Sequence, residues 1–133
     1  MSEMGKEAER ILKDAESLYH EAMRELDSGK LRDAAEKAWG ATVRATNALI
    51  LARTGKEIDG TRGMTKAFEE LIREDRKLET LEGRYFTRES FLHGHCFYMG
   101  ILEPREQIER RIVETMEYIQ DARKLARKVA ERG

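Results

Sequence analysis

The chain has 133 residues, with 25 Lys and Arg against 26 Asp and Glu. Its formal net charge of −1 provides no strong electrostatic field to attract nucleic acid or an anionic membrane. A single cysteine excludes a disulfide framework and a cysteine-based metal site, and no apolar run is long enough to span a membrane. We therefore expect one soluble, cytoplasmic domain without a cofactor, and the high Glu, Lys and Arg content is typical of a thermophile.

Two long helices are predicted in the first half of the chain. The first spans Ser2 to Ser28, where apolar residues recur at spacings of three and four, and the second spans Leu31 to Thr54. Each is followed by a glycine. The second contains a stripe of alanines at alternating steps of four and three, which allows a neighbouring helix to approach closely: Ala34, Ala38, Ala41, Ala45, Ala48 and Ala52. Arg44 and Asn47 lie beside this stripe, either as part of a binding site or as edge residues that reach water.

The second half of the chain also has only helical patterns. Residues 56–63 are polar with two glycines, so we predict a loop there and regard it as a candidate flap. A weaker helix should run from Met64 to Leu81, separated by Gly83 from the next one, and a last helix should run from Pro104 to about Arg132. The expected inner face of that last helix comprises Ile108, Ile112, Thr115, Met116, Ile119, Ala122, Ala126 and Val129. The predicted fold is all-α, an antiparallel bundle of about five helices in one domain covering residues 1–133.

The helix predicted from Arg84 to Met99 is the centre of the chain. It contains two of the three histidines, the only cysteine and most of the aromatic residues, and it should stop at Gly100. At about 100° per residue its apolar side chains fall on two sides, so both sides must be covered. Buried polar groups are costly without partners, yet this helix also carries arginine, glutamate and histidine. The combination indicates a functional role.

Most catalytic signatures are missing from the sequence. There is no glycine-rich phosphate loop, GxSxG, HExxH or aspartate-rich metal loop. Glu89 precedes His93 by four residues and this pattern occurs once, which does not match a di-iron bundle, so no metal site is predicted. The remaining pattern is an arginine followed by histidine, as Arg88-x4-His93 or Arg88-x6-His95.

With this motif the chain resembles the HEPN-domain superfamily, and it is most similar to the small archaeal HEPN-like proteins. The resemblance rests on the Arg–His spacing, the alanine-rich helix AAEKAWGATVRATNALI, the aromatic residues in HGHCFY and the Leu92-His93 pair. It implies a metal-independent endoribonuclease, often a toxin or defence factor, that dimerises so that both copies of the Arg and His line one cleft. Active members usually carry Asn, Asp or His after the arginine, whereas this chain has Glu89, which either orients His93 or neutralises Arg88.

The candidate catalytic residues are therefore Arg88, His93 and Glu89, and the candidate binding residues are Arg84, His95, Tyr98, Asn47 and Arg44. Alternatives are a non-catalytic nucleotide- or protein-binding module, such as the partner of a nucleotidyltransferase, and a structural helical adaptor. We predict a homodimer that uses the central helix, with Arg88 and one of the two histidines partly exposed in a groove. If RNA is cleaved, His93 is the expected base, and the cut should persist in EDTA and leave a 2′,3′-cyclic phosphate.

Overall fold

The structure is a computed structural model that describes residues 5–58 and 60–132, with side chains described for 5–58 and 62–127. Within these residues there are helices and no strand, which confirms the predicted all-α fold. No helix among them is long and apolar enough to cross a bilayer. The elements are α1 (Lys6–Asp27), α2 (Leu31–Thr54), α3 (Gly60–Glu74), α4 (Leu78–Arg88), η1 (Glu89–Tyr98), α5 (Arg105–Val113) and α6 (Thr115–Arg132).

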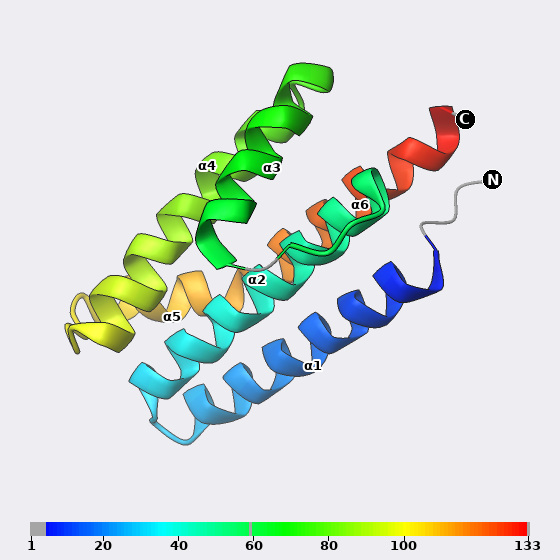
Figure 1. The fold of residues 1–133 in the computed structure, drawn as a ribbon. Coiled ribbons are helices and arrows are strands. Elements are labelled where there is room, and N and C mark those ends of the chain that lie inside the picture. The colour runs from blue at the N-terminus through cyan, green and yellow to red at the C-terminus, as the bar shows by residue number, and fades with distance from the viewer. Residues whose placement is uncertain (1–4, 59, 133) are drawn as a thin grey trace.

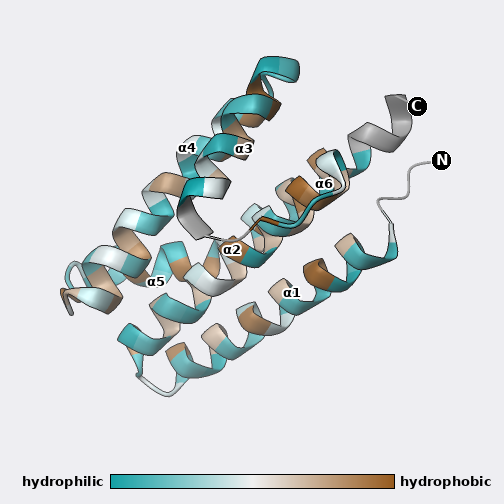
Figure 2. Cartoon of the chain, in the orientation of Figure 1, coloured by the Kyte–Doolittle hydropathy of each residue, from teal (hydrophilic) through white to brown (hydrophobic). Residues whose placement is uncertain are grey.

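Helix α2 is the element against which the others pack. It runs beside α1, and α6 and η1 lie along its other sides (Figure 1). Helices α3 and α4 lie next to each other on one side of the bundle, and the start of α1 and the end of α6 are at the same end. In Figure 2 hydrophobic and hydrophilic bands alternate along α1 and α2, as expected for helices with one buried face.

The alanine stripe forms the inner surface of α2. Ala34, Ala38, Ala41, Ala45 and Ala48 are completely buried, and Ala52 is partly buried. A methyl side chain lets a helix axis approach closely, and here α1 and α6 use that space. The predicted inner face of the last helix is also buried, except that Met116 is partly exposed and Val129 lies outside the described side chains.

A buried hydroxyl pair joins α2 to α6. The Tyr118 and Thr46 hydroxyl oxygens are 2.7 Å apart, and Thr46 donates to the Thr42 carbonyl, also at 2.7 Å. Because the Thr46 hydroxyl has one proton, Tyr118 must be the donor of the pair. Burial raises the pKa of Tyr118 far above its ordinary value, so this hydroxyl remains a donor at neutral pH.

Three predicted boundaries are wrong. The break between the third and fourth helices lies at 75–77, and Gly83 is inside α4. The reason is a turn at Asp75, whose Oδ1 accepts the backbone N–H of Lys77 at 3.1 Å. Helix α3 begins at Gly60, so the loop is shorter than 56–63, and the last helix is divided at Glu114. The predicted start of the first helix at Ser2 lies outside the described residues.

The central helix has an unexpected geometry. It continues without a break from α4 into η1, and from Glu89 to Tyr98 it is a π-helix, with hydrogen bonds such as Met99 N–H to the Gly94 carbonyl at 3.0 Å. It ends at Gly100, which has a φ of +70°, as predicted. The wider turns change the predicted faces, because successive residues advance by less than 100°. Three residues at spacings of four are buried: Arg88, Leu92 and Cys96.

Candidate functional site

Arg88 lies in the core between α2 and the α5–α6 junction. Only 6% of the residue is exposed. Its Nε donates to Thr42 Oγ1 at 3.0 Å, and one terminal nitrogen donates to the Arg111 carbonyl at 3.2 Å and to Thr115 Oγ1. Burial lowers the pKa of Arg88 to about 10, with smaller contributions from the neighbouring arginines, and the group remains charged at neutral pH. The predicted partial exposure of Arg88 is therefore wrong, because α2, α5 and α6 provide acceptors that hold the guanidinium inside.

His93 lies apart from Arg88, over the first half of α2. Its Nδ1 is 2.9 Å from Glu36 Oε1, and 40% of its side chain is exposed. The ring stacks on Trp39, with 6.1 Å between centroids, and on Phe97 at 6.3 Å. His93 is thus partly exposed, as predicted for one of the two histidines. It is held by a carboxylate from another helix rather than by Glu89.

A hollow of about 170 Å³ opens beside His93, and we call it the Trp39 hollow. The buried Oδ1 of Asn47 has no hydrogen-bond partner there. Burial, with a smaller contribution from the Glu89 carboxylate, raises the pKa of Tyr85 to about 12, so the charge of Glu89 lies near this ring. Three of the candidate residues, Asn47, Glu89 and His93, therefore share one hollow. Its lining consists of Trp39, Val43, Asn47, Ile58, Met64, Tyr85, Glu89 and His93.

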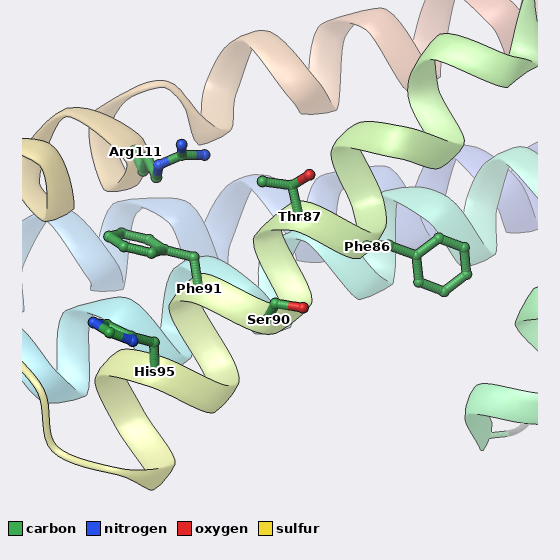
Figure 3. A pocket seen from close by; sticks show the side chains of 6 residues that line it. All are labelled: Phe86, Thr87, Ser90, Phe91, His95 and Arg111. Carbon is green, nitrogen blue, oxygen red and sulfur yellow. The ribbon is translucent and has the colours of Figure 1, made fainter.

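His95 lines a different hollow of about 490 Å³, which we call the Phe91 hollow (Figure 3). Its ring stacks on Phe91 with 5.4 Å between centroids and 11° between planes. The guanidinium carbon of Arg111 is 4.8 Å from the centre of the same Phe91 ring. Figure 3 shows Phe91 between Arg111 and His95. The lining consists of Phe86, Thr87, Ser90, Phe91, His95 and Arg111, and it contains no carboxylate.

Arg111 is the least satisfied cation of this region. Its buried Nε has no hydrogen-bond partner, and it has no ion pair among the residues that the structure describes. A third hollow, of about 600 Å³, is lined by Arg111 together with Arg84 and Arg88. Four acidic side chains line that hollow as well. Arg84 is paired with one of them, Asp121, at 2.7 Å.

Two candidate residues, Arg44 and Tyr98, line none of the three hollows. Arg44 pairs with Asp14 of α1 at 2.8 Å. Tyr98 is 76% exposed at the end of η1, and its ring centroid is 6.4 Å from that of His93. The structure thus brings Asn47, Glu89 and His93 together and separates them from Arg88 and His95.

Sequence reasoning missed two residues of the candidate site, Glu36, which holds His93, and Arg111, which lines the Phe91 hollow. Glu36 is 57 positions before His93, and no local pattern pairs them. Arg111 lies in a helix rich in charged residues, where nothing in the spacing distinguishes it from Arg110. The only available signal was the position of Arg111 three residues after Ile108 and one before Ile112, at the edge of a buried face.

A family model described as the archaeal PaREP1/PaREP8 family matches residues 10–131. No curated protein and no solved structure matches the chain.

Proposed function

The chain belongs to the archaeal PaREP1/PaREP8 family, and from this premise we propose that it is a HEPN-like binding module that holds single-stranded RNA in the Phe91 hollow. A phosphate would contact Arg111, and a base would stack on the column formed by Phe91 and His95. The sequence left open a non-catalytic nucleotide- or protein-binding module, and we propose single-stranded RNA as the ligand of such a module.

The supporting observation is the composition of the Phe91 hollow. The chain has 26 acidic residues, yet none lines this hollow, whereas a cation, an imidazole and the hydroxyls of Thr87 and Ser90 do. Arg111 has an unused buried donor, and guanidinium groups are well suited to phosphate. Stacked rings are the usual platform for unpaired bases. Together these groups would provide a cation for the phosphate and a stacking surface for the base of a nucleotide.

Cleavage by the Arg88–His93 pair receives less support from the geometry. Metal-free RNA cleavage requires a base near the 2′-hydroxyl and a cation at the same phosphate. Arg88 directs its donors to Thr42, Thr115 and the Arg111 carbonyl, and His93 is bonded to Glu36 in a different hollow. Arg88 is therefore not free to act on a phosphate without leaving its partners, and it lines a different hollow from His93.

The proposal includes a homodimer. Four large apolar side chains are exposed around the end of η1 and the end of α5, where a second copy would cover them. They are Tyr98, Met99, Ile101 and Val113. A nucleotidyltransferase, which the HEPN resemblance implies as a partner, is the alternative occupant of this surface.

Fluorescence anisotropy with a labelled single-stranded RNA tests the proposal. Arg111→Gln should weaken binding by at least about tenfold, the value of one lost charge-assisted hydrogen bond, and should lower the salt dependence by about one phosphate contact. Arg110→Gln is the matched control, because it removes the same charge from the neighbouring exposed position of α5. Equal effects of the two substitutions, or no RNA binding by the unmodified protein, would contradict the proposal. A mononucleotide that competes fully would narrow the ligand to a single nucleotide.

A further inference from the structure

The Trp39 hollow carries a second inference, which does not depend on the proposed RNA site. We infer that it binds a small aliphatic amine in its ammonium form. The polar atoms of the hollow, its aromatic walls and the absence of a cation among its lining residues support this ligand.

Two residues of the lining offer acceptors to such a ligand. Asn47 contributes a buried Oδ1 without a partner, and Glu89 contributes a carboxylate. A carboxylate and an unpartnered amide oxygen favour a ligand that has several donors. An ammonium group has three N–H donors and no acceptor.

The walls of the hollow suit the rest of such a ligand. Trp39 and Tyr85 have ring centroids 5.0 Å apart and form an aromatic corner, and aromatic faces attract cations. Val43, Ile58 and Met64 complete the lining with apolar surface for a hydrocarbon chain. The volume of about 170 Å³ is below that of pockets for drug-sized ligands, so a small amine fits better than a nucleotide.

The charge of the hollow is also unbalanced. No lysine or arginine lines it, and Glu89 has no ion pair within the described part of the chain. Its neighbour in sequence, Arg88, directs its guanidinium to Thr42 and Thr115 instead. A carboxylate beside apolar surface is costly without a cation, and a bound ammonium would provide that cation.

Trp39 makes the experiment direct, because it is the only tryptophan of the chain and lines the hollow. Its fluorescence should change saturably when butylamine is added to the full-length protein at neutral pH. 1-Butanol has the same chain and no charge, so it should produce no saturable change at the same concentrations. An equal response to both compounds, or no response to butylamine up to about 10 mM, would overturn the inference; the millimolar range is the weak end of specific affinities.

Two variants locate the bound amine. Glu89→Gln keeps the shape and removes the charge, and it should weaken butylamine binding by at least about tenfold. Asn47→Leu removes an acceptor that has no partner, so the variant should remain folded while binding also weakens. Glu82→Gln, which removes a carboxylate of α4 outside the hollow, is the control and should leave the affinity unchanged. Affinity unchanged in both hollow variants would place the amine elsewhere and refute the assignment.

Discussion

Replacing Arg88 by lysine tests whether this arginine is a structural anchor of the core. Lysine keeps the positive charge but has no donor at the position of Nε, so the bond to Thr42 must be lost. One hydrogen bond to a charged group contributes about 1.5–3 kcal/mol, and the ammonium is more strongly hydrated than the guanidinium, which adds to its cost of burial. We therefore expect Arg88→Lys to lower the free energy of unfolding by about 2–3 kcal/mol.

Urea denaturation followed by circular dichroism measures this loss. With a slope of about 2 kcal/mol per molar urea, the midpoint should fall by about 1 M or more. Arg84→Lys is the matched control, because Arg84 lies one turn earlier on α4 and makes a half-exposed pair with Asp121 that a lysine can replace. That control should change stability by less than about 1 kcal/mol. If the two variants lose the same stability, Arg88 is not held in the core, and it is again available for a catalytic role.

Three further predictions concern the core, the dimer and the chemistry. Tyr118→Phe should lower the free energy of unfolding by about 1–2 kcal/mol, because Thr46 loses the buried hydroxyl that donates to it. A double-mutant cycle with Thr46→Val should show a coupling energy of about 1 kcal/mol between the two hydroxyls. Light scattering at micromolar concentration should show a dimer that Met99→Glu converts into a monomer, whereas a monomeric wild type would contradict the proposed interface. Any RNA cleavage should persist in EDTA and leave a 2′,3′-cyclic phosphate; a metal requirement would refute the HEPN-like chemistry.

The fold was predictable where one periodicity extends over a whole helix. The alanine stripe of α2 and the inner face of α6 follow the α-helical spacing closely, so their burial could be derived from the sequence. The break at Asp75 could not, because leucines at 71, 78 and 81 continue a plausible apolar pattern across it. The turn depends on side-chain hydrogen bonding by Asp75, which helical periodicity does not represent.

The candidate site was less predictable for a geometric reason. Its residues were assigned to faces at 100° per residue, and this spacing fails from Glu89 onward. Arg88 is the last residue of the α-helical part, and its buried acceptors Thr42 and Thr115 are 46 and 27 positions away in the sequence. Contacts of this kind depend on tertiary packing, so the grouping of the three hollows became visible only in the folded chain.

The π-helical geometry of η1 affects how this protein can tolerate changes in chain length. Losing one residue between Glu89 and Tyr98 could be absorbed by narrowing a wide turn to an α-turn, so that the ends of the helix stay in place. The same loss in the middle of α2 would rotate half of the alanine stripe by about 100° and remove it from the core. Single-residue insertions and deletions among relatives should therefore be concentrated in η1. Each such change would present different side chains to the Trp39 and Phe91 hollows, so their lining can change while the packing of α2 stays the same.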